Sequence, residues 1–300
     1  MKGNGTAMAE PTFRVARRLV VDKTVAEHAK FAIKDACAWG GWSPRGWREY
    51  RRGEAHRPPP AATFTAARLA GAVLDAARTQ ARDSLWHNRT LIKKAGALGR
   101  TVQAQIAPLL RTVLRQAPGG LCAEVGCAYA AVARMMRDEF PAIAWHLFDL
   151  APAGDLLEAN RDLARDGLEF KPCYALDAFE AGTVTYDAVV FNEVLSMMSA
   201  EQAALYLAAL RARTSFVVFS EPAKILFRPG RLDVDAIPVD GPLFCGAFLV
   251  HNYRRMFARA GYRLLHYDVD RSPEANASPQ HFMIRGVATP APTELISGRL

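Results

Sequence analysis

The sequence predicts an α/β protein built on a doubly wound sheet, with a helical extension in front of it. From residue 121 onward, short apolar runs alternate with segments of helical character, which is the pattern of a mainly parallel sheet covered by helices. The first apolar run, residues 121–125, contains Glu124 near its end and leads into a small-residue turn at Gly126. Residues 1–117 carry 21 Lys and Arg against 8 Asp and Glu, whereas residues 118–300 carry 17 against 22. This charge asymmetry indicates two units with different roles.

The apolar runs predict seven strands, the last two of which form an antiparallel pair that ends the sheet. A long segment punctuated by Pro and Gly, residues 221–250, is predicted to be a lid over a site, because loops of this length in compact domains are usually functional. The predicted strands are residues 121–125, 144–149, 168–172, 186–191, 215–220, 262–268 and 282–287, and the predicted helices are residues 130–139, 154–166, 200–213 and 251–260.

The N-terminal part has a different character. Three domains are predicted: a basic helical extension (1–117), the α/β domain (118–290) and a C-terminal tail (291–300). The extension would close a substrate pocket or build a homodimer. Its basic aromatic loop has three possible roles: to stack on single-stranded nucleic acid, to cover a flat substrate, or to dock on the α/β core. We expect the loop to dock on the core through its aromatic residues. The extension is predicted to comprise a disordered stretch (1–12), helices at 20–39, 61–80 and 84–116, and the loop at 42–60.

Bulk properties exclude several classes of protein. No apolar run approaches the roughly 20 residues that a membrane-spanning helix needs. The first ten residues lack the apolar core of a secretion signal, which predicts a cytoplasmic protein. Five cysteines are scattered without CxxC spacing, so we expect free thiols and no metal site.

The turn at Gly126 and an acidic residue 23 positions later carry the most specific signal. Glu124, Gly126, Ala128 and Ala130 follow the pattern acid-x-Gly-x-Gly-x-Gly, with Ala at the second and third Gly positions. Asp149 ends the second predicted strand, where an acid is placed to bind ribose hydroxyls in a doubly wound fold. An acid directly before the turn would repel the pyrophosphate of NAD. Together these residues resemble the cofactor site of the class I S-adenosylmethionine-dependent methyltransferases, which have a Rossmann-like sheet of seven strands.

The resemblance covers about residues 118–290 and implies roles for individual residues. The turn with Gly126 and Ala128 would pass beneath the amino-acid part of S-adenosylmethionine, and Glu124 would help to hold its ammonium group. Asp149, with Leu150 after it, would bind the ribose hydroxyls through charge-assisted hydrogen bonds.

Further residues follow the third, fourth and fifth predicted strands. Asp177 and Ala178 match the position that contacts adenine, although Asp177 in an Asx turn is equally consistent with the sequence. Asn192 would line the cofactor pocket, and Glu193 would orient the substrate or accept a proton. His251, between the predicted lid and a helix, is the second candidate base, because a hydroxyl must lose its proton to accept a methyl group. Each candidate base has an alternative explanation that fits the sequence equally well. Glu193 would cap a nearby helix or pair with a surface cation, and His251 would be exposed to water at the start of a helix.

The predicted function is therefore S-adenosylmethionine-dependent methyl transfer to a small metabolite, as O-methylation in natural-product or sugar metabolism. The layout from about Leu85 onward is also similar to that of sugar O-methyltransferases. The Asn/Asp-Pro-Pro-aromatic signature of enzymes that methylate amino groups of nucleic acids is absent, which disfavours a nucleic-acid substrate. Two alternatives stay open: an RNA or protein methyltransferase that docks through the basic N-terminal part, and a repurposed, non-catalytic fold, which Ala128 and Ala130 favour.

Overall fold

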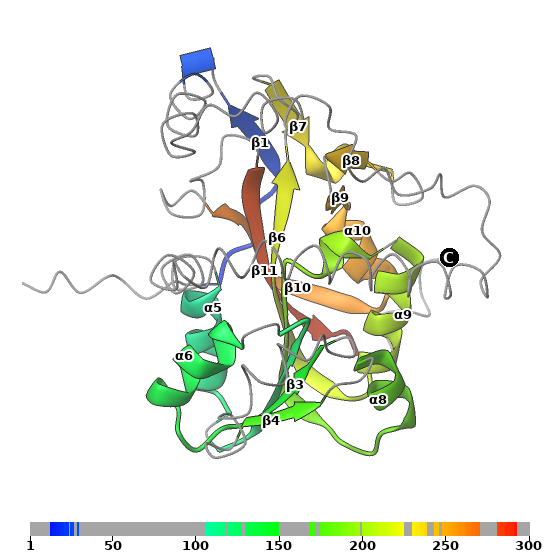
Figure 1. Cartoon of the computed structure of the whole chain (residues 1–300). Coiled ribbons are helices and arrows are strands. Elements are labelled where there is room, and N and C mark those ends of the chain that lie inside the picture. The colour runs from blue at the N-terminus through cyan, green and yellow to red at the C-terminus, as the bar shows by residue number, and fades with distance from the viewer. Residues whose placement is uncertain are drawn as a thin grey trace, which may run out of the picture.

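The computed structural model contains a mixed seven-stranded sheet with helices on both faces (Figure 1). Several predicted features lie outside the residues that the structure describes: the stretch 1–12, the loop 42–60, the helix 61–80, most of the helix 84–116 and the helix 154–166. The structure describes residues 13–23, 25–26, 29, 106–117, 119–127, 130–149, 168–171, 175–198, 200–224, 230–238, 243–245, 248–270 and 281–292.

The strands of the main sheet follow the order β10-β11-β6-β5-β2-β3-β4. Neighbours from β6 to β4 pair in parallel, whereas β11 is antiparallel to both β6 and β10. The prediction of seven strands with a terminal antiparallel pair is confirmed. Their bounds are β2 Leu121–Val125, β3 Ala144–Phe148, β4 Leu168–Lys171, β5 Tyr186–Asn192, β6 Thr214–Lys224, β10 Tyr262–Asp270 and β11 His281–Pro290.

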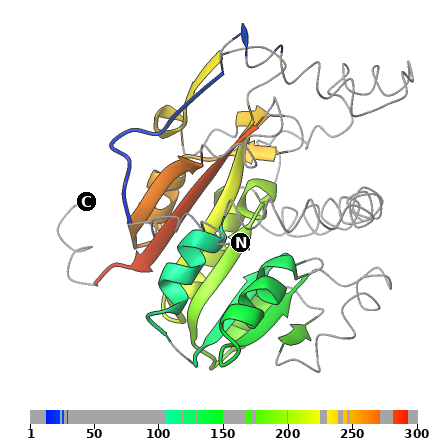
Figure 2. The same ribbon diagram turned by 90° about the vertical axis from the view of Figure 1, so that its left-hand side faces the viewer.

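The central strands are buried on both faces, which explains their nearly continuous apolar sequences. In β5, Val189 and Phe191 belong to the core on one side of the sheet, and Ala188 and Val190 to the core on the other. The helices α5 (Ala107–Leu114) and α6 (Ala131–Glu139) pack on the second side, as Figure 2 shows. The first side is covered by α8 (Ala175–Ala181), α9 (Ala200–Leu210) and α10 (Tyr253–Arg259).

The strand order also fixes where a ligand can be expected. The chain passes from β2 to β3 on one side, and β5 lies on the other side of β2. In open α/β sheets, ligands bind outside the carboxyl ends of the strands where the order reverses in this way. The turns after β2, β3 and β5 therefore meet at the candidate site.

The predicted secondary structure is wrong in two places, the segment 221–250 and the N-terminus, whereas the role of 221–250 as a lid stays a prediction. Residues 221–224 continue β6, because β11 pairs with it as far as Lys224 and His281. Farther along, the segment contains β7 (Gly230–Asp233), a 3₁₀ turn η4 (Val234–Ala236), β8 (Leu243–Cys245) and β9 (Phe248–Val250). Residues 20–23, predicted as the start of a helix, form the strand β1 (Val20–Lys23), which pairs antiparallel with β7. Two consecutive β-branched residues with an available strand edge favour this outcome.

The N-terminal segment docks on the α/β domain before it reaches β1. Val15 forms a parallel bridge with Tyr267 of β10, which is the edge strand of the main sheet. The guanidinium of Arg14 lies 3.0 Å from Asp268, and Arg18 pairs with Asp233. Part of the basic excess of the N-terminus is therefore matched by acids of the C-terminal half. Among the described residues, no helix is long and apolar enough to cross a membrane.

Candidate active site

The turn after β2 is shaped by glycine. Gly126 has a φ of +64°, which side chains rarely tolerate. A Cβ placed there would lie 2.6 Å from Cγ2 of Val194, a residue of the turn after β5. The next amide, of Cys127, donates to the carbonyl of Phe148 at the end of β3, at 3.0 Å. The turn is thus held between the ends of β5 and β3, as the strand order requires.

Ala130 occupies the last position of the predicted glycine pattern and adopts a left-handed conformation, with a φ of +51°. It caps the N-terminus of α6 without a side-chain hydrogen bond. The chain therefore keeps a glycine-like backbone at this position although Ala replaces Gly, at a cost of about 1–2 kcal/mol. Ala128 lies outside the described residues, so its effect on the turn stays a prediction.

Glu124 is buried beneath this turn, with 4% of its surface exposed. Its Oε2 accepts the backbone N–H of Ala133 in α6 at 3.1 Å. Burial raises the pKa of Glu124 to about 8; the backbone N–H of Ala133 opposes the rise, and the negative charge of Asp149 adds to it. The predicted ammonium-binding acid is thus also a side chain that ties β2 to α6.

Asp149 follows β3 directly and is half-buried. Burial raises the pKa of the Cys127 thiol, and the charges of Glu124 and Asp149 raise it further. Two carboxyl groups and a buried thiol therefore converge at this edge, where the negative charge of Asp149 and the carboxyl oxygens favour a cation or hydrogen-bond donors. Leu150 lies outside the described residues.

The turn after β5 is the second component of the site. Glu193 is exposed and has a φ of +59°, and its N–H donates to the carbonyl of Ser220 at 2.8 Å. Non-glycine residues in this conformation are often found at functional sites because their strain must be held by surrounding structure. The predicted pocket residue Asn192 lies just before it, at the end of β5.

Glu221 of β6 holds the turn from one side, a contact that the sequence analysis missed. It is fully buried, and its carboxylate accepts the backbone N–H groups of Val194, Leu195 and Ser196 at 2.9–3.1 Å. Burial raises the pKa of Glu221 to about 8, although the three donors favour the ionised form and limit the rise. In the sequence, Glu221 directly follows the apolar run 215–220, which gives little indication that it lies in a strand.

His251 holds the same turn from the other side. Its Nε2 lies 3.1 Å from the carbonyl of Leu195 and 3.0 Å from that of Met198, so this nitrogen carries the proton and donates. Burial lowers the pKa of His251, and the residue is 5% exposed. A role as base would therefore have to run through Nδ1. Asn252, which follows, caps α10 by accepting the N–H of Arg255 at 3.1 Å.

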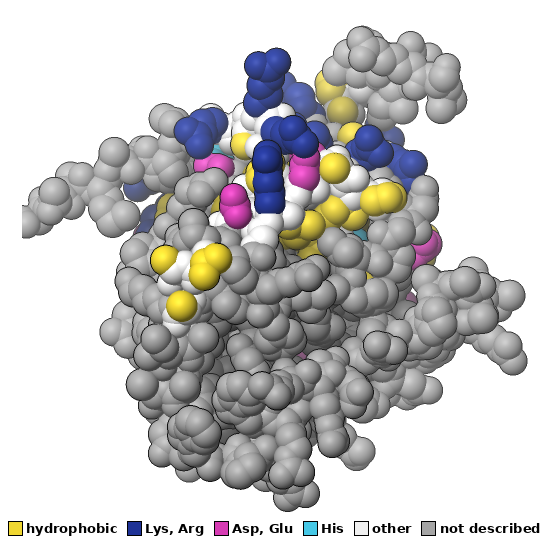
Figure 3. Space-filling view, turned by 90° about the horizontal axis from the view of Figure 1, so that it is seen from above, with side chains coloured by type: hydrophobic (Ala, Val, Ile, Leu, Met, Phe, Trp, Pro, Cys, Tyr) yellow, Lys and Arg dark blue, Asp and Glu magenta, His cyan; other side chains and the backbone are white. Residues whose placement is uncertain are grey.

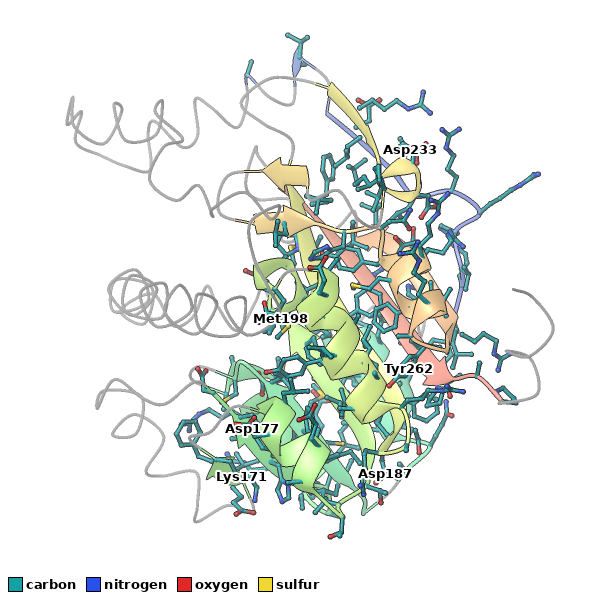
Figure 4. All side chains as sticks on the ribbon, turned by 90° about the vertical axis from the view of Figure 1, so that its right-hand side faces the viewer. Lys171, Asp177, Asp187, Met198, Asp233 and Tyr262 are labelled. Atoms are coloured by element: carbon teal, nitrogen blue, oxygen red, sulfur yellow. The ribbon has the colours of Figure 1, made fainter. Side chains whose placement is uncertain are left out.

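Asp177 and Ala178 lie in the first turn of α8, not in a loop. Asp177 is exposed and Ala178 is half-buried. In Figure 4, Asp177 and Met198 lie toward one end of the sheet, whereas Asp187 and Tyr262, near the starts of β5 and β10, lie toward the other. The adenine-contacting role of Asp177 and Ala178 stays a prediction.

Comparison with solved structures places this arrangement among known folds. The chain is similar to a Burkholderia thailandensis 1,6-didemethyltoxoflavin-N1-methyltransferase with bound 1,6-didemethyltoxoflavin and S-adenosylhomocysteine, with a TM-score of 0.51 and 14% identity over 80% of this chain and 97% of that one. The fold is that of the class I S-adenosylmethionine-dependent methyltransferases.

The chain is also similar to a magnesium protoporphyrin IX methyltransferase from Synechocystis with bound S-adenosylmethionine. It matches with a TM-score of 0.44 and 11% identity, over 65% of this chain and 81% of that one. The sequence matches no protein-family model and no curated protein. The resemblance inferred from Glu124, Gly126 and Asp149 is thus confirmed at the level of the fold.

Two other features of the described residues bear on function. No group of three or more His, Cys, Asp or Glu among them is arranged to hold a metal ion. On the face seen in Figure 3, Lys and Arg side chains gather near a few acids. An open hollow of the protein is lined by Arg17, Arg18, Asp233, Asp235, Ala236, Asn252, Arg254 and Arg255.

The hollow bears on the alternative of docking through the basic N-terminal part. Arg18 pairs with Asp233, and Arg254 lies 3.2 Å from Asp235, so two of the four guanidinium groups are neutralised. This lowers the positive potential available to RNA or an acidic protein.

Proposed function

We propose that the protein is an S-adenosylmethionine-dependent methyltransferase that transfers a methyl group to a hydroxyl oxygen of a small metabolite. The observation that carries the proposal is the convergence of Glu124, Gly126 and Asp149 at the carboxyl edge of a methyltransferase-type sheet. The Burkholderia neighbour, an N1-methyltransferase whose structure holds S-adenosylhomocysteine and a small molecule, has the same fold and supports the choice of the cofactor and of a small acceptor.

The residues present fit the cofactor. S-adenosylmethionine carries a sulfonium and an ammonium group. The charge of Asp149 attracts such a ligand, and Glu124, whose pKa burial raises to about 8, can ionise when an ammonium group binds beside it. Gly126 is exposed, and a side chain there would collide with Val194, so glycine lets the turn after β2 pack against the turn after β5 at the edge where the cofactor would lie. When bound, the cofactor supplies an electrophilic methyl group.

The chain's own residues would bind and orient both reactants. Asp149 would accept hydrogen bonds from two ribose hydroxyls, and Glu124 would face the ammonium group. Glu193 would accept the proton of the acceptor hydroxyl, because it is exposed at the carboxyl end of β5 while His251 is buried and already donates from Nε2. His251 would then hold the turn that carries Glu193.

Calorimetric titration with S-adenosylmethionine, S-adenosylhomocysteine and NAD tests the cofactor assignment. We expect both adenosyl compounds to bind and NAD not to bind. Asp149→Ala should weaken S-adenosylmethionine binding at least tenfold, because two charge-assisted hydrogen bonds are lost. The matched control is Asp138→Ala, at an exposed position of α6, which should bind like the wild type. Equal affinity in the two variants would remove the ribose assignment, and no binding by the wild type would favour the repurposed fold.

Three broader predictions remain part of this proposal. These are the location in the cytoplasm, the division into an extension, an α/β domain and a tail, and a homodimer built by the extension. Sedimentation of the full chain at several concentrations would test the homodimer, because only an associating chain changes its apparent mass with concentration.

A further inference from the structure

A row of polar side chains crosses four strands near the carboxyl end of the main sheet. Asn192 of β5 is in register with Ser220 of β6, Ser220 with Arg285 of β11, and Arg285 with Asp268 of β10. Side chains of residues in register project from the same face of a sheet. This face is the one on which α5 and α6 pack (Figure 2).

The preceding row on the same face is apolar on β5, β6 and β11, and it continues to Glu124 on β2 and His266 on β10. Val190, Val218 and Val287 are in register two residues before the polar row on β5 and β6 and two residues after it on the antiparallel β11. All three are fully buried in the core beneath α5 and α6. The change from valines to Asn, Ser and Arg therefore occurs in one step on all three strands, at the edge where the turn with Glu193 begins. A packed core gives no reason for such a change.

Three atoms of the polar row are buried and lack hydrogen-bond partners. They are Oδ1 of Asn192, Oγ of Ser220 and Nε of Arg285. The Ser220 residue is fully buried. An unsatisfied buried polar group costs about 1–3 kcal/mol, so groups of this kind in a folded protein call for a partner. Strands lie about 4.8 Å apart, so the three positions extend over about 10 Å, which is the size of a small organic molecule.

The chemistry of the three atoms indicates what the partner carries. A carboxamide oxygen only accepts, a guanidinium nitrogen only donates, and a hydroxyl does both. A hydroxyl group of a ligand can satisfy each of them. The positive charge of Arg285 is already faced by Asp270, whose Oδ2 lies 3.4 Å from Nη1, and Asp268 is paired with Arg14 at 3.0 Å. The row is thus close to neutral and does not favour a phosphate.

We propose that Asn192, Ser220 and Arg285 bind hydroxyl groups of the methyl acceptor, and that this acceptor is a neutral polyhydroxylated molecule of the sugar or cyclitol class. The inference rests on the proposed function, and it names the substrate class of that same site. Because Asn192 immediately precedes Glu193, a ligand held along the row would place one hydroxyl at the turn where its proton can be accepted.

Saturation-transfer NMR on the full chain with saturating S-adenosylhomocysteine tests the row. The probes are myo-inositol and methyl α-D-glucopyranoside, with cyclohexanol as the probe of similar size and a single hydroxyl. We expect the two polyols to bind more tightly than cyclohexanol. Ser220→Ala and Arg285→Lys should each weaken polyol binding about fivefold, because each removes one hydrogen-bonding group. Cyclohexanol should respond less to either change.

Matched controls distinguish the loss of a side chain of the polar row from the effect of any substitution in the strands of the sheet. Ser215→Ala, at an exposed position of β6, and Arg263→Lys, at an exposed position of β10, should leave polyol binding unchanged. Polyols that bind no better than cyclohexanol, or that bind the row variants and the wild type equally, would overturn the inference. Calorimetry with S-adenosylhomocysteine tests the proposed function separately: its failure to bind the wild type, with polyol binding intact, would contradict the methyltransferase assignment and leave the row standing.

Discussion

Oε1 of Glu221 lies 2.9 Å from the backbone nitrogen of Leu195 and joins β6 to the turn after β5. The same carboxylate also receives the N–H groups of Val194 and Ser196. The imidazole of His251 donates to the carbonyl of Leu195, so one residue of the turn is held at both its N–H and its C=O. The strained backbone of Glu193 precedes these contacts, and they supply the surrounding structure that keeps it in place.

Glu221→Ala should destabilise the protein by about 3–5 kcal/mol, because three buried N–H groups lose their acceptor. Glu221→Gln should cost about 1–2 kcal/mol, since an amide oxygen can still accept two of the three. Chemical denaturation followed by circular dichroism measures both. A loss below about 1 kcal/mol for Glu221→Ala would show that the turn does not depend on this side chain.

Gly126→Ala should weaken S-adenosylmethionine binding and lower stability, because the new Cβ would lie 2.6 Å from Cγ2 of Val194 and the φ is +64°. Val194→Ala in the same chain should recover part of the loss by removing the collision, but not the part due to the backbone. The two effects are separated by a double-mutant cycle on the free energy of unfolding. If the two substitutions proved additive, the contact between the turns would not be the cause.

Ala130→Gly should stabilise the protein by up to about 1 kcal/mol. It relieves the left-handed conformation of Ala130, and the greater flexibility of Gly in the unfolded chain offsets part of the gain. The matched control is Ala131→Gly, one residue later within α6, which should instead cost about 1 kcal/mol. Thermal unfolding of the two variants should therefore move in opposite directions, and a shift in the same direction would contradict the assigned strain.

The sheet, and the positions of three candidate site residues at its carboxyl edge, could be predicted because their signals are local. Strand β2 begins and ends where the apolar run 121–125 does, and Glu124, Gly126 and Asp149 lie where a strand end and a turn place them. A continuous apolar run predicts a buried parallel strand, and an acidic residue at the end of the run marks where the strand ends.

The parts that failed depend on partners distant in the sequence. Residues 20–23 are a strand because Gly230–Asp233 offers an edge more than 200 positions away. Strand β6 extends past its apolar run because β11 pairs with it as far as Lys224. The apolar run alone predicts a strand that ends at residue 220, which puts Glu221 in the segment predicted to be a lid. The helical reading of Asp177 was missed because a seven-residue helix gives too few turns for periodicity.

The pKa of Glu124 links cofactor binding to pH. The folded-state pKa of about 8 lies above the ordinary 4.5, so the folded protein favours the protonated form of this carboxyl near neutral pH. The contribution of Glu124 to stability is fully present below pH 4.5 and is lost as the pH rises through about 8. Glu124→Gln should therefore flatten the fall in the free energy of unfolding between pH 5 and pH 8, in denaturation curves recorded across that range.

An ammonium group bound beside Glu124 would favour its ionised form and expel the proton. We therefore expect the binding of S-adenosylmethionine at pH 7 to release protons from the wild type, and fewer protons from the Glu124→Gln variant. Calorimetry in buffers of different ionisation enthalpy counts these protons. The α-amino group of the ligand titrates near pH 8 and contributes equally to both proteins, so their difference isolates Glu124. An identical proton count in the two proteins would mean that the ammonium group binds elsewhere and that Glu124 only ties β2 to α6.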